Sequence, residues 1–195
     1  MIAALFVATD GAYFGVPDVD PWDERRDARL YAGPHPVVAH PPCSTWCQVA
    51  HVNQKRYGHR VGDDGGCFAS ALANVRRVGG VLEHPAESYA WREFGLLRPV
   101  RGAWSRSIDG AWVTDVNQRA YGHRARKRTW LYAVVDAPPR LDWSNPPPVA
   151  TVSFLTNHGG GRLPRLSKRE AKATPLPFRD MLLGIARSVA RTEAA

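Results

Sequence analysis

Two polar segments of the sequence directly follow short apolar runs, and both carry residue types that can do chemistry. VVAHPPC places His40 and Cys43 after one apolar run, and VLEHP places Glu83 and His84 after another. Ligands of open α/β sheets bind beyond the carboxyl ends of the strands, so we expect these side chains to meet at one rim. Free cysteines are often simply small buried apolar residues. The two prolines before Cys43 and the carboxylate of Glu83 favour a positioned nucleophile instead.

A third segment, YGHRARKRTW at residues 121–130, carries four cations immediately before an apolar run. Runs of charge usually form a solvated loop, which is one interpretation of this segment. Side chains alternate along a strand, however, so Arg126 and Arg128 would share one face if the segment enters a strand directly. The pair would then offer forked guanidinium donors at a fixed spacing instead of a diffuse basic patch.

A metal site is an alternative use of the same cysteine segment. The candidate ligands are spaced 3, 4 and 4 residues apart and are His40, Cys43, Cys47 and His51. If the residues after Pro42 are helical, the last three lie on one face, and Cys67 or His59 could complete a zinc site. The chain has no CxxC pair, and the spacing of a zinc deaminase is also missing. We therefore expect no metal and keep this set as the alternative.

The elements that must position these residues are short strands alternating with helices. Apolar runs predict strands at residues 2–8, 36–40, 81–83 and 130–135. Helical spacing predicts a helix that residues 63–66 open and residues 79–80 close, and others at 86–94 and 178–190. Ser167 and Glu170 fit a capping box at the start of a further short helix. Residues 17–29 read as a loop, 95–115 as a loop or small hairpin, and 157–161 as a flexible glycine loop. This alternation predicts a layered α/β fold with a largely parallel sheet.

Composition limits the class of protein. The chain has 195 residues, and its 26 Lys and Arg against 18 Asp and Glu give a net charge of +8. This length predicts one domain, and the positive charge favours a polyanionic partner. We expect no membrane span, because no apolar run is long enough, and no signal peptide, because residues 1–7 lack a basic flank. Three cysteines are an odd number, which predicts reduced thiols in the cytoplasm.

Several of these motifs, in their order along the chain, resemble those of the DNA cytosine C5-methyltransferases. PPCS at residues 41–44 resembles the Pro-Cys nucleophile loop of that family, and LEHP at 82–85 resembles its Glu-Asn dipeptide. YGHRARKRTWLYAV is similar to its Tyr-Gly…Gln-x-Arg-x-Arg segment, and LSKREA at 166–171 to its Thr-Pro-Arg-Glu-Ala run. LFVATDGAYFG at 5–15 faintly resembles its Phe-x-Gly-x-Gly cofactor loop. The arrangement looks most like small phage or prophage members of the family.

The resemblance implies a fold and a place in the cell. We expect residues 1–195 to form a single compact three-layer domain with a mostly parallel sheet, a trimmed Rossmann-like methyltransferase fold. Residues 136–165 would form an irregular Pro/Gly-rich insertion in place of a recognition domain. A homodimer could complete the shortened site. The protein would act in the cytoplasm, which for a phage-encoded member is the cytoplasm of the host.

The resemblance also implies a mechanism. Cys43 would add to C6 of cytosine, Glu83 would bind ring N3 and the exocyclic amine, and Arg126 with Arg128 would hold the base or a phosphate and favour the thiolate. The base would be flipped out of DNA or presented as a single strand or nucleotide, and S-adenosylmethionine would supply the methyl group. Trp104 and Trp112 are candidates to fill the vacated space or to be core. The implied cofactor-binding residues are Phe6, Thr9, Asp10, Gly11 and Pro41, and the implied DNA-binding residues are Ser44, His84, Arg124, Lys127 and Arg169.

Two other functions stay open. AHPPCSTWCQ shares Pro-Pro-Cys and a later Gln with thymidylate-synthase-type enzymes, so the same cysteine chemistry could use another one-carbon donor on nucleotides. A non-catalytic, basic DNA-binding protein on a methyltransferase-like scaffold is the second, and it would need no cysteine. For a ribose-binding acid, the available carboxylates are Asp10, Asp18, Asp20 and Asp23, none of which follows an evident second strand. The cations of the non-catalytic alternative are Arg126, Lys127, Arg128, Arg165, Lys168 and Arg169.

Overall fold

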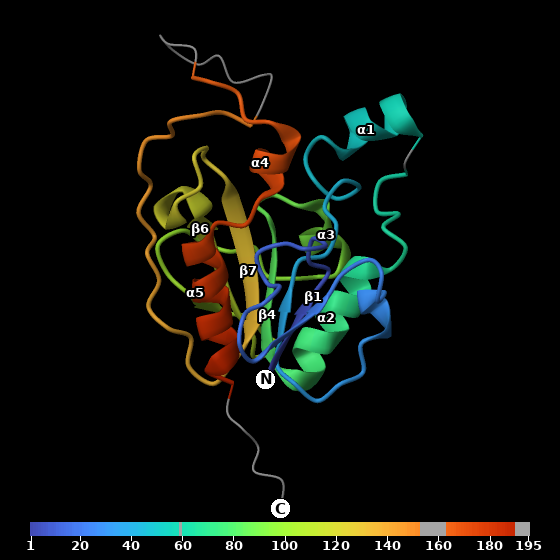
Figure 1. Cartoon of the computed structure of the whole chain (residues 1–195), viewed down its shortest axis with the longest axis vertical. Coiled ribbons are helices and arrows are strands. Elements are labelled where there is room, and N and C mark those ends of the chain that lie inside the picture. The colour runs from blue at the N-terminus through green and yellow to red at the C-terminus, as the bar shows by residue number, and fades with distance from the viewer. Residues whose placement is uncertain (59, 153–162, 190–195) are drawn as a thin grey trace, which may run out of the picture.

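Seven short strands form one sheet in the computed structural model, which describes residues 1–58, 60–152 and 163–189. The strand order across the sheet is β2-β1-β3-β4-β7-β6-β5, and Figure 1 shows helices packed around it. The strands are β1 (Ile2–Leu5), β2 (Val19–Trp22), β3 (Val37–Ala39), β4 (Gly80–Pro85), β5 (Ser105–Arg106), β6 (Trp112–Asn117) and β7 (Arg128–Val134).

The sheet is mixed, and its longer ladders are antiparallel. β2, β1, β3 and β4 run parallel, whereas β7 is antiparallel to both β4 and β6, and β5 is antiparallel to β6. β7 pairs six residues with each neighbour, but β1 and β3 pair only three. The prediction of a mostly parallel, three-layer Rossmann-like fold is therefore wrong. A strand that is buried on both faces has an apolar sequence whether its neighbours are parallel or antiparallel. The sequence of β7 therefore did not reveal its direction.

The two longest helices lie on opposite faces of the sheet. α2 (Cys67–Val78) packs on β3, β4 and β7, and α5 (Leu176–Arg187) packs on β1, β3 and β4. Alternate strand residues point to opposite faces, so Leu5 and Leu82 enter the core beside α2, and Val38 and Val81 enter the core beside α5. We call these the α2-side core and the α5-side core. The other helices are α1 (Ala50–Tyr57), α3 (Tyr89–Glu93), α4 (Lys168–Lys172) and two 3₁₀ turns, η1 (Ala28–Leu30) and η2 (Gln118–Tyr121).

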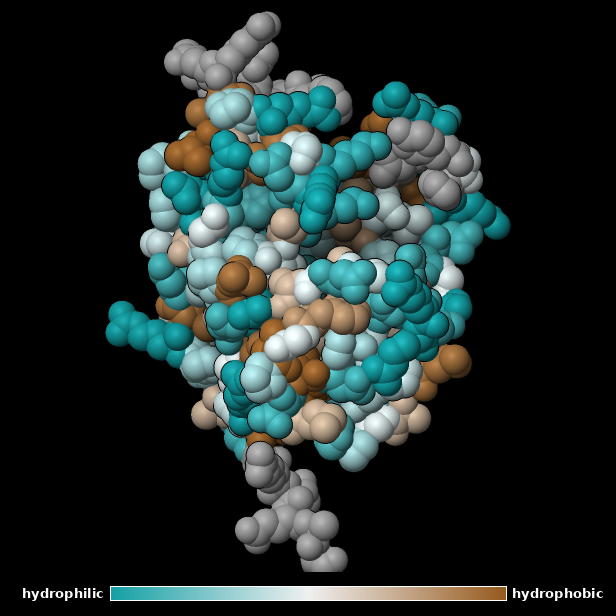
Figure 2. Space-filling model, in the orientation of Figure 1, coloured by the Kyte–Doolittle hydropathy of each residue, from teal (hydrophilic) through white to brown (hydrophobic). Residues whose placement is uncertain are grey.

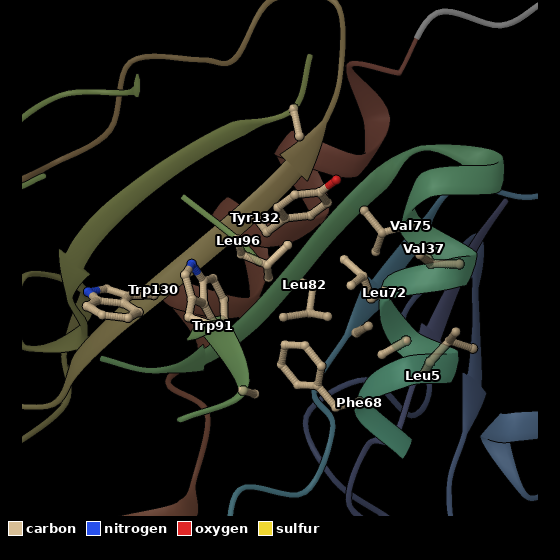
Figure 3. Packing of buried hydrophobic residues seen from close by; sticks show 14 of the residues in the cluster. Leu5, Val37, Phe68, Leu72, Val75, Leu82, Trp91, Leu96, Trp130 and Tyr132 are labelled. Atoms are coloured by element: carbon tan, nitrogen blue, oxygen red, sulfur yellow. The ribbon is translucent and has the colours of Figure 1, made fainter. Parts of the chain in front are cut away.

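The α2-side core is rich in aromatic side chains and confirms the predicted helix stripe. Phe68, Ala71, Leu72 and Val75 of α2 are all buried, and Figure 3 shows this helix against Leu82 and its neighbours. The expected strands at β1, β3, β4 and β7 and the helices at α3 and α5 are also present; β1, β3 and α3 are shorter than expected, and β4 and β7 are longer. α4 carries the predicted capping box. β5 and β6 form the small hairpin that was one of the two expectations for residues 95–115, although β6 continues to Asn117. β2 was not predicted, because it contains Asp20 and Pro21 and lies at the lateral edge of the sheet, where proline is tolerated.

The segment after β7 packs along the sheet as far as it is described. Leu141 is buried in the α5-side core, Trp143 donates its Nε1–H to Thr114 Oγ1 at 2.9 Å, and Trp104 donates to the Pro139 carbonyl at 2.8 Å. The expected glycine loop at 157–161 lies outside the described residues. Within the described residues, no helix combines the length and apolar character needed to cross a membrane.

Gly80 gives a test of the packing between β3 and β4. Its φ is +117°, and a Cβ there would lie 2.0 Å from the Val37 carbonyl oxygen, which is a backbone atom. We expect Gly80→Ala to lower the free energy of unfolding by at least about 3 kcal/mol, measured by urea denaturation. Gly110→Ala is the matched control, because its φ is +82° but nothing lies within 4 Å; it should cost only about 1 kcal/mol. Equal losses for both variants would contradict this account.

Candidate functional site

The candidate site lies at the sheet edge where the carboxyl ends of β1, β3 and β4 meet the start of β7. Ala39 pairs with Leu82, so the next residues along these two strands, His40 and Glu83, are neighbours. α4 and α1 stand on either side of this edge (Figure 1). Figure 2 shows the molecular surface hollowed between them. The sequence-based expectation that residues after several strands gather at one edge therefore matches the geometry for His40, Cys43 and Glu83.

A chain of hydrogen bonds joins three side chains beneath this edge. His40 Nδ1 lies 2.9 Å from Glu83 Oε1, and His40 Nε2 lies 2.7 Å from the Tyr13 hydroxyl. Tyr13 is buried in the α5-side core, and the side chains of His40 and Glu83 are only 10% and 15% exposed. Arg179 of α5 donates to the Ala12 carbonyl at 2.8 Å, which anchors the loop that carries Tyr13.

The charges along this chain determine which atoms carry protons. Burial alone would raise the pKa of Glu83, but the hydrogen bond and charge of His40, and the charge of Lys127, outweigh it and lower this pKa. Burial, reinforced by the charge of Glu83, raises the pKa of Tyr13 well above 10. Tyr13 therefore keeps its proton, and the Nδ1–H of His40 donates to the Glu83 carboxylate, which can only accept.

Cys43 sits beside this chain in a turn and is half-buried. Its carbonyl accepts hydrogen bonds from the backbone N–H groups of Trp46 and Cys47. Burial, and then the neighbouring Cys47 and Glu83, raise the pKa of the Cys43 thiol to about 11, while Lys127 and Lys172 act to lower it. The free protein thus holds a protonated thiol, so any addition reaction must remove this proton when the substrate is bound.

His84 lies on the other face of the sheet and serves the α2-side core. It is fully buried, with Nδ1 2.8 Å from Ser88 Oγ and its ring stacked on Trp91 and against Phe68. Burial lowers the pKa of His84 to about 4, although Glu83 and the Pro42 carbonyl favour its proton. His84 is therefore neutral and does not reach the surface where DNA would bind.

The basic segment before β7 divides between the two faces. Arg126 and Arg128 line one small cleft together, as strand alternation predicted. Arg128 forms an ion pair with the buried Asp115 on the side of Trp130, away from Glu83. Lys127 instead interacts electrostatically with both Glu83 and Cys43. A cation that acts on the candidate nucleophile is thus Lys127, which the sequence analysis had placed only among the DNA-binding residues.

The other expected DNA-binding residues lie around the same edge. Ser44 follows Cys43 and is exposed, Arg169 is exposed on α4, and Arg124 pairs with Glu170 of α4 at 3.2 Å. Lys172, at the end of α4, acts on Cys43. Trp104 and Trp112 are half-buried and pack against the α5-side core. We find these two rings used mainly for packing.

The residues expected to bind S-adenosylmethionine lie in the loop after β1 and before Cys43, and the acid nearest to them in the fold is engaged within the protein. Asp23 directly follows β2, where an acid could hold ribose hydroxyls. It is only 4% exposed, however, and accepts hydrogen bonds from Thr9 Oγ1 and from the amides of Arg25 and Arg26. Gly11 packs with its α-carbon against the Ala8 carbonyl. The other expected residues are Phe6 and Asp10, both with positive φ, and Pro41, which is buried. The described residues therefore do not fit the ribose of this donor.

The alternative metal set is not brought together. His40 is held by Tyr13 and Glu83, and His51 is exposed on α1, with its ring against Tyr89 at 5.3 Å. Among the described residues, no three His, Cys, Asp or Glu side chains converge on a point that could hold a metal ion.

The sequence analysis missed Tyr13 and Lys172 and gave Lys127 only a DNA-binding role. Tyr13 lies in the loop after β1 and meets His40, 27 residues later, only through tertiary packing. The sequence analysis took Arg126 and Arg128, on either side of Lys127, as the functional pair, so it did not place Lys127 beside Cys43. The alternation of Lys127 with Leu131, which faces the α5-side core, is the sequence signal that could have placed it beside Glu83.

The charges around Cys43 predict its reactivity. Glu83→Gln removes a negative charge that raises the thiol pKa, so alkylation of Cys43 by iodoacetamide at pH 8 should become faster. Lys127→Met removes a positive charge that lowers this pKa, so alkylation should become slower. Peptide mass spectrometry would separate Cys43 from Cys47 and Cys67. Lys55→Met, on exposed α1, is the control and should leave the rate unchanged; the same rate in all variants would contradict the geometry.

His84 predicts a loss of stability in mild acid. Its pKa is about 4 in the folded protein and near 6.5 when unfolded, so the unfolded chain binds the extra proton between these values. The free energy of unfolding should fall by about 3 kcal/mol from pH 6.5 to pH 4 through this group, and stay unaffected by it above pH 6.5. His84→Phe cannot titrate, and should show a shallower fall in urea denaturation at the same pH values. Identical slopes would refute a neutral buried His84.

Comparisons with family models, with curated proteins and with solved structures found no match to this chain. The resemblance to cytosine C5-methyltransferases therefore stays a hypothesis based on the motifs. The function has to be argued from the side chains and from the places where the fold puts them.

Proposed function

We propose that this protein modifies cytosine bases of DNA at C5, with Cys43 as the nucleophile that adds to C6. One observation carries the proposal. Cys43, Glu83 and Lys127 come from three separate segments, and they meet within electrostatic range of one another at one sheet edge. A half-buried thiol beside an ionised carboxylate and an ammonium group has the parts that addition to a pyrimidine needs.

The addition step balances with the groups present. The Cys43 S–H bond breaks, an S–C6 bond forms, the C5=C6 π electrons form a C4=C5 bond, and the C4=N3 π electrons move to N3, which gains the proton. The product is an enamine that is nucleophilic at C5. Glu83 is suited to carry the proton from the thiol to N3, because its Oε1 is fixed by His40 while Oε2 accepts no hydrogen bond from the described residues.

The cations have a separate part in this proposal. Lys127 and Lys172 both act to lower the pKa of Cys43, so they favour the thiolate as it forms. The exposed cations of α4 and α1 flank the recess between these helices, and phosphates of a DNA strand would meet them there. A base must leave the duplex, or belong to a single strand, to reach a half-buried thiol. Such an enzyme would act in the cytoplasm.

The donor of the group that C5 receives is a separate question from the activation of C5. Because Asp23 is saturated by Thr9 and by backbone amides, we derive no transfer step from S-adenosylmethionine. The proposal covers formation of the C6 adduct. The group that C5 then receives is an outcome of the experiment below, in which this donor and a folate donor can each be supplied.

A non-catalytic DNA-binding protein is the second candidate function. The observation that favours it is the pKa of about 11 for Cys43, because so few thiolates exist at neutral pH in the free protein. Arg126 is exposed. Arg124 is also exposed and pairs with Glu170 of α4, which carries the exposed Lys168 and Arg169. This surface could therefore bind DNA phosphates without catalysing a reaction.

Hydrogen exchange at C5 tests the proposed chemistry without a donor. Reversible addition of Cys43 to C6 lets C5 take a proton from water, so DNA with deuterium at cytosine C5 should lose it, measured by mass spectrometry. We expect exchange with the wild-type protein, on single-stranded DNA more than on duplex, and at least about a hundredfold less with Cys43→Ser or Glu83→Gln.

The control for this experiment is Cys67→Ser at the start of α2, which should exchange like the wild type. A second arm uses DNA that contains 5-fluorocytosine, with each donor in turn, and looks for a covalent adduct on Cys43. DNA binding without exchange in every condition would reject the enzyme and support the binding protein.

A further inference from the structure

The hydrogen-bonded chain of Tyr13, His40 and Glu83 is built from three elements that the sequence separates. Tyr13 comes from the loop after β1, His40 from the end of β3 and Glu83 from β4. The strands β3 and β4 pair in register, and Arg179 of α5 holds the Tyr13 loop by donating to the Ala12 carbonyl. Three polar side chains are therefore held together where the surrounding core is apolar, and each has a partner for the atoms that face inward.

One arrangement of protons matches every donor of this chain with an acceptor. Glu83 is ionised and can only accept, so His40 Nδ1 must carry the hydrogen that joins them. Tyr13 keeps its hydroxyl proton, and in this arrangement it donates to Nε2 of His40, 2.7 Å away. The reversed tautomer would turn a lone pair toward a carboxylate and a hydrogen toward a hydroxyl hydrogen. Tyr13 thus selects the tautomer that His40 presents to Glu83.

We propose that Tyr13 and His40 form a positioning relay for Glu83. The relay rests on the proposed function, because its purpose is to aim the carboxylate that handles the thiol proton. The Nδ1–H of His40 holds Oε1, so the carboxylate plane is fixed and Oε2 is presented to the thiol and the base. His40 and Tyr13 touch no substrate; they act through Glu83.

The charged surroundings are consistent with a fixed, ionised Glu83. Lys127 acts on it in addition to His40, and His84 does so from the other face of the sheet, while Arg179 and Asp180 of α5 lie near Tyr13. Cys43 has Cys47, Lys127 and Lys172 around it besides Glu83.

The alternative explanation for these hydrogen bonds is that they only satisfy buried polar groups. In that case the direction of the hydrogen bonds would have no effect on the rate.

The tautomer can be measured in the free, full-length protein. ¹⁵N NMR of labelled histidine, with the His40 signals identified by their loss in His40→Asn, should show hydrogen on Nδ1 and a lone pair on Nε2. Tyr13→Phe should give a mixture of both tautomers. Hydrogen on Nε2 in the wild-type protein would overturn the relay, whatever the protein does to DNA.

Matched substitutions test whether the hydrogen-bond direction matters for the rate. Asn at position 40 can place an amide donor near the position of Nδ1, whereas Gln places its amide near Nε2. In the C5-exchange assay, His40→Asn should therefore keep most of the rate, while His40→Gln and Tyr13→Phe should lose about fivefold or more with DNA affinity unchanged. Tyr31→Phe is the control, because Tyr31 is also buried and hydrogen-bonded, to the His35 carbonyl, and should not change the rate.

The outcomes separate the two proposals. If the wild-type protein exchanges C5 hydrogen but the Asn and Gln variants of His40 behave alike at equal folded fraction, the relay is wrong and the proposed function stands. If the wild-type protein shows no exchange, the proposed function is wrong, and the relay loses the reaction that it would serve. Urea denaturation of each variant gives the folded fraction.

Discussion

The buried carboxylate of Glu83 is the constraint on which this edge of the molecule depends. An unpaired charge at such a site would cost several kcal/mol, and removing one partner of a buried pair is strongly destabilising. The protein compensates with His40, which directly follows β3, and with Lys127, which directly precedes β7 on the other side of β4. This arrangement needs β3, β4 and β7 side by side, and it needs the loop after β1 folded over them so that Tyr13 can complete the chain.

The antiparallel strand β7 has a direct effect on the site. In a sheet of parallel strands only, every carboxyl end would contribute a loop that leads away to a helix. Here β7 begins at the edge where β4 ends, so the basic residues before it arrive beside Glu83. Strand alternation then separates these cations. Lys127 faces the thiol and the carboxylate, whereas Arg128 is neutralised by Asp115 on the far face.

The two faces of the sheet are used differently. On the α2 side, aromatic rings around Phe68 surround His84 and keep it neutral, which makes that face a closed core. On the α5 side, the core ends in the polar chain of Tyr13, His40 and Glu83 and opens toward the recess between α4 and α1. Adjacent residues of β4 therefore have opposite roles, because Glu83 and His84 point to opposite faces. The proposed function uses only the α5 side and its rim.

The sequence by itself determined the local elements and the rim residues. The stripe of α2, the capping box of α4 and the apolar runs of β1, β3, β4 and β7 follow from spacing, and polar residues after β3 and β4 meet because parallel strands end at a common edge. The tertiary structure alone decided the direction of β7, the pairing of Tyr13 with His40, and which cation faces Cys43. These depend on contacts between residues far apart in the chain, and a strand buried on both faces carries no signal of its neighbours' direction.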